Sequence, residues 1–70
     1  MEFIKMHGTG NDFIFLLDLD DKYIGQESNL AKKLCHRRFG IGADGLVLVR
    51  KSEIADIKMV IVNSDGSAAN

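Results

Sequence analysis

The sequence has too few cysteines for a disulfide and apolar runs too short for a membrane span. Cys35 is the only cysteine among the 70 residues, so an intramolecular disulfide is excluded. Apolar runs reach only four to five residues, whereas a helix needs ~20 to cross a bilayer. The N-terminus lacks the apolar stretch of a signal peptide. We therefore expect a protein of the reducing cytoplasm with no membrane partner.

Metal ligands and excess positive charge are also scarce. His7, Cys35 and His36 are the only soft ligands, and their spacing fits no standard zinc site. The formal net charge is -1, whereas proteins that bind nucleic acids usually carry a strong basic excess. We therefore expect neither a metal site nor a nucleic-acid partner.

The composition is that of a folded protein, with 46% apolar and 27% charged residues. A chain of this length makes one small domain at most, and such a domain is only marginally stable alone. Short apolar runs rich in branched and aromatic residues predict strands at about 2–6, 13–17, 46–49 and 57–62. The polar segment 50–53 predicts a hairpin connection, and segment 18–25 predicts a surface loop.

A helix is predicted from about Ser28 to Phe39. Ser28 can accept hydrogen bonds from the first-turn amides, and Gly40 can adopt the left-handed conformation that ends many helices. Apolar side chains recur at helical spacing along one face, namely Leu30, Ala31, Leu34 and Cys35. We therefore expect Cys35 to pack in the core rather than to act as a reactive thiol.

The strands at 13–17, 46–49 and 57–62 are apolar at nearly every position, which predicts a sheet covered on both faces. One helix of about three turns can cover only one of them. Either another chain or residues beyond Asn70 would cover the other face. An uncovered apolar face could also support a homo-oligomer.

Glycine and asparagine gather in three short segments, at 5–13, 39–45 and 63–67. Taken alone, each segment is explained by turn formation. Asn11 and Asn63 have two interpretations: their amides can hold the amino group or carboxylate of an amino acid, or they can bond to nearby backbone. Local capping of backbone amides is the expected role of Asp12, Asp44 and Asp65.

Taken together, these segments resemble the diaminopimelate epimerase family. Three sequence boxes occur in the family's order and approximate spacing, and they span nearly the whole chain. They read MHGTGNDF at 6–13, LCHRRFGIGADG at 34–45 and VNSDGS at 62–67. Three linked boxes are far more specific than any one of them.

The resemblance implies a reaction, a fold and a site. Family members interconvert LL- and meso-diaminopimelate with neither pyridoxal phosphate nor metal, on the route to lysine and cell-wall precursors. Their fold has two similar domains, each a curved sheet around a central helix, with the substrate between them. Residues 1–70 would then be part of the N-terminal domain, with an α+β fold: a mixed, largely antiparallel curved sheet and one helix. Asn11 and Asn63 match substrate-binding positions, whereas Gly45 stands where some members have glutamine.

The resemblance also implies that this chain holds no catalytic residue. Two cysteines, one from each domain, act as base and acid, and the first lies in a Cys-Gly-Asn box that would follow Asn70. Cys35 belongs to the second sequence box and cannot replace it. We therefore expect residues 1–70 to be inactive alone and to need no cofactor. The alternatives are another cofactor-independent racemase or epimerase of the superfamily, and a small non-catalytic module that self-associates.

Overall fold

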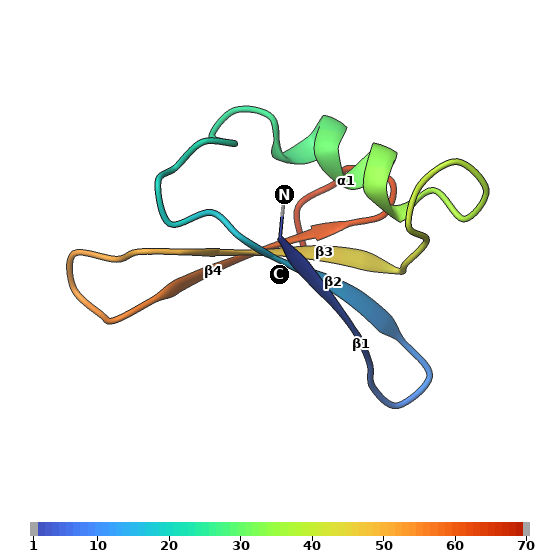
Figure 1. Ribbon diagram of the computed structural model, residues 1–70, viewed down its shortest axis with the longest axis horizontal. Helices are drawn as coiled ribbons and strands as arrows, with labels where there is room; N and C mark the ends of the chain where they lie inside the picture. The colour runs from blue at the N-terminus through green and yellow to red at the C-terminus, as the bar shows by residue number, and fades with distance from the viewer. Residues whose placement is uncertain (1, 70) are drawn as a thin grey trace.

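Four strands and one helix make up the computed structural model, which describes residues 2–69 (Figure 1). In chain order they are β1 (Phe3–His7), β2 (Asp12–Leu17), α1 (Glu27–Cys35), β3 (Gly45–Arg50) and β4 (Lys58–Asn63). Every strand lies where an apolar run predicts it, with shifts of one residue at the ends.

The strands pair in chain order, and the pairing is mixed. β1 and β2 are antiparallel, β2 and β3 are parallel, and β3 and β4 are antiparallel. A parallel pair needs a crossover connection, which α1 and its flanking loops supply. Figure 1 shows a twisted sheet with α1 lying over one face. The α+β fold with a mixed, largely antiparallel sheet is therefore confirmed.

The core lies between α1 and the sheet face that it covers. Alternate residues of the strands point toward the helix, and the buried apolar ones are Ile14, Leu16, Leu46, Leu48 and Val62. Ala31 and Cys35 of α1 pack against them. As predicted, Cys35 is a core residue, and its burial raises the pKa of the thiol.

The helix differs from its prediction at both ends. Gln26, rather than Ser28, is the N-cap residue, and no side chain caps the first amides. The predicted end at Phe39 is wrong, because His36 is extended with ψ 121° and residues 37–39 form a turn. The shortened helix is far from the length that a membrane span requires, and no other helix occurs in residues 2–69.

The chain ends α1 early because it folds back onto the carbonyls of the last turn. The amides of Ile41 and Gly42 both donate to the Leu34 carbonyl, over 2.8 and 2.9 Å. Gly42 makes this return possible with φ +86°. The sequence predicted Gly40 as the left-handed residue that ends the helix, but that residue is Gly42.

The predicted surface loop 18–25 is buried at its first residue. Asp18 and Arg50 are 2% and 5% exposed, and Arg50 Nε donates to Asp18 Oδ2 over 2.9 Å. Arg50 Nη2 also lies 3.0 Å from Glu27 Oε2. Burial opposes ionisation of Asp18, but hydrogen bonds from Arg50 and two backbone amides outweigh it, so the Asp18 pKa lies below its ordinary value. This ion pair ties the loop to the end of β3.

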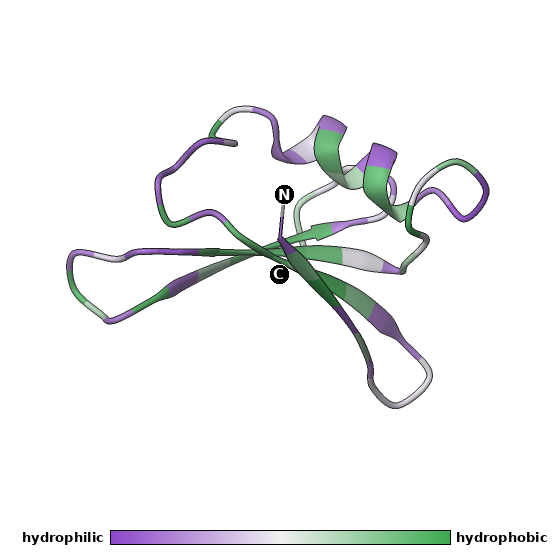
Figure 2. Ribbon diagram, in the orientation of Figure 1, coloured by the Kyte–Doolittle hydropathy of each residue, from purple (hydrophilic) through white to green (hydrophobic). Residues whose placement is uncertain are grey.

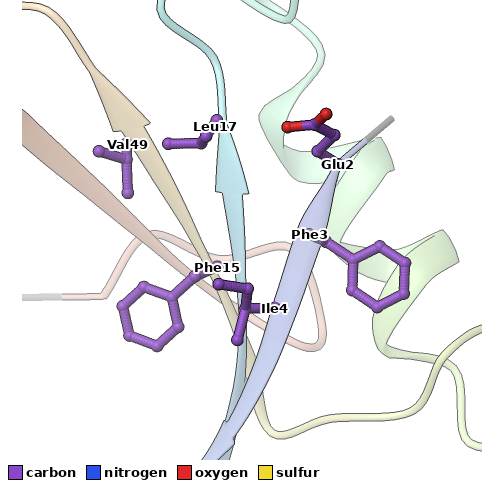
Figure 3. A pocket seen from close by; sticks show the side chains of 6 residues that line it. All are labelled: Glu2, Phe3, Ile4, Phe15, Leu17 and Val49. Carbon is purple, nitrogen blue, oxygen red and sulfur yellow. The ribbon is translucent and has the colours of Figure 1, made fainter.

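The other face of the sheet is apolar in the described part of the chain, and α1 does not cover it: its outer strands are exposed, although Val47 in β3 is 4% exposed. By alternation along the strands, it carries Ile4, Met6, Phe13, Phe15, Leu17, Val47, Val49, Met59 and Ile61. We call this surface the open face. Figure 2 shows the hydrophobic colouring along these strands, and in Figure 3 Ile4, Phe15, Leu17 and Val49 share one side while Phe3 turns to the other. Exposures of 66% at Ile4 and 57% at Met59 agree with the prediction that one helix covers only one face.

Replacing Arg50 with methionine should lower the free energy of unfolding by about 3–5 kcal/mol, because the Asp18 carboxylate would remain buried without its cation. Lys51→Met is the matched control, since Lys51 is the next residue and is exposed. Urea unfolding followed by circular dichroism measures both variants. An Arg50 effect no larger than that of Lys51 would contradict the role given to the buried pair.

We expect residues 1–70 alone to self-associate through the open face, because exposed apolar patches usually mark interaction surfaces. Ile4→Glu should weaken this association, since a carboxylate would have to be buried at the contact. Ile54→Glu is the control, because Ile54 is 98% exposed and lies in the connection between β3 and β4. Sedimentation velocity over a concentration series distinguishes them. A cooperatively melting monomer at every concentration would refute the expectation.

Candidate functional site

Three loops meet where β2 and β3 begin and where β1 and β4 end (Figure 1). Loop 8–11 joins β1 to β2, loop 36–44 joins α1 to β3, and loop 64–67 follows β4. Gly45, the first residue of β3, lies opposite Asn63, the last residue of β4. Neighbouring strands are about 4.8 Å apart, so the three loops lie close enough to contact one small ligand. We call this region the loop edge.

The first loop is closed by its own backbone and exposes its asparagine. The Gly8 amide donates to the Asn11 carbonyl over 2.7 Å, and Gly10 takes a left-handed conformation with φ +80°. The Asn11 side chain is exposed and has no hydrogen-bond partner within residues 2–69. It is therefore free to contact a ligand.

Asp12, Arg37 and Asp44 form a charged cluster beside Asn11, which we call the Arg37 bracket. Arg37 Nη1 donates to Asp12 Oδ2 over 2.9 Å, and Nη2 donates to Asp12 Oδ1 over 3.0 Å. The same Nη2 donates to Asp44 Oδ1 over 3.0 Å. Lys5 Nζ adds a further ion pair with Asp12, at 3.1 Å. One guanidinium of loop 36–44 therefore holds two carboxylates, one at the start of β2 and one at the end of its own loop.

The two aspartates of the bracket also bond to each other's backbone. The Asp12 amide donates to Asp44 Oδ2, and the Asp44 amide donates to both Asp12 Oδ1 and the Asp12 carbonyl, each over 3.0 Å. These bonds join positions 32 residues apart. The prediction that Asp12 and Asp44 cap local amides is therefore wrong.

The contacts within the bracket lower the pKa of Asp12 and raise the pKa of Arg37. Hydrogen bonds from Arg37 are the largest cause, and with Lys5 and the Asp44 amide they hold the pKa of the Asp12 carboxyl well below its usual range, against the opposing effect of burial. The pKa of Arg37 is raised, chiefly by its hydrogen bond to Asp12. Both groups therefore stay charged at neutral pH.

The third loop is a tight turn that engages the predicted binding residue Asn63. Asn63 Nδ2 donates to Ser67 Oγ over 3.0 Å, and the Asn63 amide donates to the Ser67 carbonyl over 2.8 Å. Asp65 accepts from the amide and the hydroxyl of Ser67, and these bonds lower the pKa of its carboxyl. Local capping is thus confirmed for Asp65.

Asn11 and Asn63 lie at the same edge of the sheet but do not line the same cavity. A hollow of about 390 Å³ is lined by His7, Gly8, Gly10, Asn11, Asp12, Arg37 and Asp44. Asn63 lies beyond it, on the far side of β3, with its side chain exposed. The start of β3 therefore lies between the backbones of these two asparagines.

Arg37 is the residue of the loop edge that the sequence reasoning missed. It falls within the helix predicted from about Ser28 to Phe39, and that position gave no reason to expect a contact with distant carboxylates. The available signal was a pair of aspartates at the starts of two strands, which together need a cation. No group of His, Cys, Asp and Glu side chains within residues 2–69 has the arrangement of a metal site.

Comparison with known proteins identifies the family. Residues 3–70 match the family described as diaminopimelate epimerase, which is nearly the whole chain. The chain belongs to the diaminopimelate epimerase family. The family resemblance of the three sequence boxes is thereby confirmed, and the loop edge is where these boxes meet in the structure.

The chain is similar to the diaminopimelate epimerase of Clostridium perfringens, with 64% identity over 69 residues that cover 99% of this chain and 25% of that protein. Identity to the enzyme of Carboxydothermus hydrogenoformans is 59% over 71 residues, covering 99% and 26%. For that of Alkaliphilus metalliredigens it is 54% over 69 residues, covering 99% and 24%. The chain spans about a quarter of the length of these relatives.

Gly45, the position where some family members have glutamine, leaves no room for a side chain in this structure. A Cβ at Gly45 would lie 2.6 Å from Cε1 of Phe13 and 3.2 Å from the Val62 carbonyl oxygen. The Phe13 ring thus occupies the space in which a longer side chain would begin.

Asp12→Asn should remove an acid-dependent part of the stability. The Asp12 pKa lies below its unfolded value of about 3.9. Its contribution is therefore complete above about pH 4 and is lost as the pH falls toward the lower folded pKa. We expect the variant to be less stable than the parent at neutral pH, with the difference shrinking between about pH 4 and 2 in urea unfolding.

Asp56→Asn is the control for this series, because Asp56 is exposed and has no partner among residues 2–69. Its stability should follow that of the parent at every pH. If the difference between Asp12→Asn and the parent stayed constant down to about pH 2, the carboxylate would not contribute through its charge.

Proposed function

We propose that this chain supplies substrate-holding loops of a diaminopimelate epimerase, which interconverts LL- and meso-diaminopimelate without a cofactor. The observation that carries the proposal is the family match over residues 3–70, combined with the meeting of the three boxes at one edge. Asn11 and Asn63 are the proposed substrate-binding residues. The complete enzyme would act in lysine biosynthesis in the cytoplasm.

The two asparagines suit different parts of an amino-acid substrate. The amide of Asn11 is unengaged within residues 2–69 and offers donors to a carboxylate and an acceptor to an ammonium group. The side-chain amide nitrogen of Asn63 already donates to Ser67, and this bond fixes the Asn63 side chain. The side-chain carbonyl oxygen of Asn63 remains available to accept from an ammonium group. Neither residue can serve as a base at neutral pH, so both would bind rather than transfer protons.

The reaction needs groups that the described residues do not contain. A proton α to a carboxylate is very weakly acidic, so a poised thiolate on one side and a thiol on the other are required. Cys35 cannot be either, because its thiol is 3% exposed under α1 and burial raises its pKa. A positioned acid or base contributes roughly 10²–10⁴-fold. We therefore propose that residues 1–70 alone are inactive.

Two alternatives differ from this proposal in what they require. Another cofactor-independent racemase of the superfamily would use the same loop edge with a different amino acid, and substrate profiling separates the two. A non-catalytic, self-associating module is favoured by the open face alone. It predicts no Cys-Gly-Asn box in the reading frame beyond Asn70, whereas the epimerase proposal predicts one within a few codons.

A chimera tests the proposal directly. Residues 1–70 would replace the matching 69-residue N-terminal segment of the Clostridium perfringens diaminopimelate epimerase. We expect the chimera to exchange the α-proton of diaminopimelate, measured by deuterium incorporation from heavy water, while residues 1–70 alone show none. An inactive but folded chimera, or an active 70-residue chain, would overturn the proposal.

Asn63→Ala in this chimera should lower kcat/KM about tenfold or more, the scale of a lost hydrogen bond to a charged group. Asn29→Ala is the control, because Asn29 is an exposed residue of α1, outside the loop edge. Unchanged kinetics for Asn63→Ala would remove this residue from the site.

A further inference from the structure

Arg37 is the side chain that bonds to both aspartates of the bracket, Asp12 at the start of β2 and Asp44 in loop 36–44. We propose that Arg37 is a positioning residue that sets Asn11 relative to Asn63 and thereby shapes the substrate site. The identity of the bound substrate rests on the proposed epimerase function. The bracing of the loops by Arg37 does not rest on it.

The contact between Arg37 and the aspartates is directional. Its two terminal nitrogens meet both oxygens of Asp12, and one of them also reaches Asp44. A guanidinium presents its donors in a rigid plane, so a forked contact restricts rotation and distance together. The Lys5 ammonium lies 3.1 Å from Asp12, but it is a point charge and makes no ion pair with Asp44. Lys5 therefore cannot replace the bridge.

The bracket reaches Asn11 through one peptide bond. Asn11 directly precedes Asp12, whose amide, carbonyl and side chain are all held by Asp44 or Arg37. The Gly8 amide closes the other side of the loop on the Asn11 carbonyl. The carbonyl and the N–H of the peptide that joins Asn11 to Asp12 are thus both held, while the Asn11 side chain stays free.

The bracket reaches the third loop through Asp44. The Asp44 carbonyl accepts from the Ser64 amide over 3.1 Å, and the next residue, Gly45, pairs with Asn63. A shift of Asp44 would therefore move the backbone of Asn63, through its pairing with Gly45, and that of the following residue, Ser64. Arg37, Asp44 and Ser64 form a continuous connection between the two binding asparagines.

Loss of the Arg37 guanidinium would turn the attraction that joins Asp12 and Asp44 through this cation into a repulsion between their carboxylates. Asp12 Oδ1 and Asp44 Oδ1 both bond to the same Arg37 nitrogen, so without it two carboxylates would face each other. Like charges at such a distance repel. The Asp12 side chain is only 9% exposed, which limits screening by water. The loops should then move apart and take Asn11 with them.

The test is Arg37→Gln in the full-length chimera, with Arg38→Gln as the matched control. Arg38 is the next residue and lies over the Phe39 ring at 5.6 Å, without contact to a carboxylate among residues 2–69. We expect Arg37→Gln to raise KM at least tenfold, because the binding amide is misplaced. A merely structural loss would reduce the fraction of folded enzyme and hence kcat, with KM unchanged. Arg38→Gln should change neither.

A double variant with Asn11→Ala and the conservative variant Arg37→Lys test further whether Arg37 acts by positioning Asn11. If Arg37 acts through Asn11, adding Arg37→Gln to Asn11→Ala should lower kcat/KM less than threefold further. Arg37→Lys keeps the charge without the fork and should fall between the parent and Arg37→Gln. Independent effects of the two residues, or a KM within twofold of the parent, would overturn the proposal.

Amide hydrogen exchange separates this inference from the proposed function, since it needs no turnover. In the folded chimera, Arg37→Gln should speed exchange of the Asp44 and Ser64 amides at least tenfold relative to that of Leu48 in β3, and Arg38→Gln should not. An inactive chimera with this pattern would refute the proposed function and leave the bracing established. Unchanged exchange at Asp44 and Ser64 would refute the bracing, whatever the activity.

Discussion

Pairing β2 with β3 in parallel brings the first residues of both strands to the same edge, and with them two carboxylates. Asp12 and Asp44 stand at those starts, and their backbones bond to each other. The cation that bonds to both carboxylates comes from the segment that crosses between the strands. This cation is Arg37, two residues after the end of α1. The parallel pair therefore requires the crossover, the crossover supplies the cation, and the cation holds the loops.

This dependence explains which features could be predicted from sequence. The strands are readable because β2, β3 and β4 are runs of branched and aromatic residues, and the helix because Leu30 to Cys35 repeats at helical spacing. The end of the helix was not readable. His36 to Phe39 continue with residues that tolerate a helix, but the chain folds back there and places the amides of Ile41 and Gly42 on the Leu34 carbonyl. Local propensity was overridden by this turn, which also brings Arg37 to Asp12, 25 residues away in sequence.

The candidate site was predictable to a similar extent. Family boxes identified the three loops and their asparagines, and the sheet register brings them to one edge. The roles of Asp12, Asp18 and Arg50 depend on partners 25 to 32 residues away, for which the sequence has no periodic signal. Asp65 was predicted correctly because its partner, Ser67, is local. Among the three aspartates predicted to cap local amides, the range of contact therefore separates the correct prediction, Asp65, from the wrong ones, Asp12 and Asp44.

The contacts that shape the loop edge and those that cover the sheet are independent. Every member of the Arg37 bracket has its partners within residues 2–69, and none of these bonds depends on the open face. The open face leaves apolar side chains in contact with water. Its one polar side chain among the described strand residues is that of Asn63 at its end, so a covering surface would need to supply few hydrogen bonds. Any apolar surface of suitable shape could therefore complete the sheet without disturbing the loops. Bracing the loop edge and covering the sheet are therefore separate tasks in this fold.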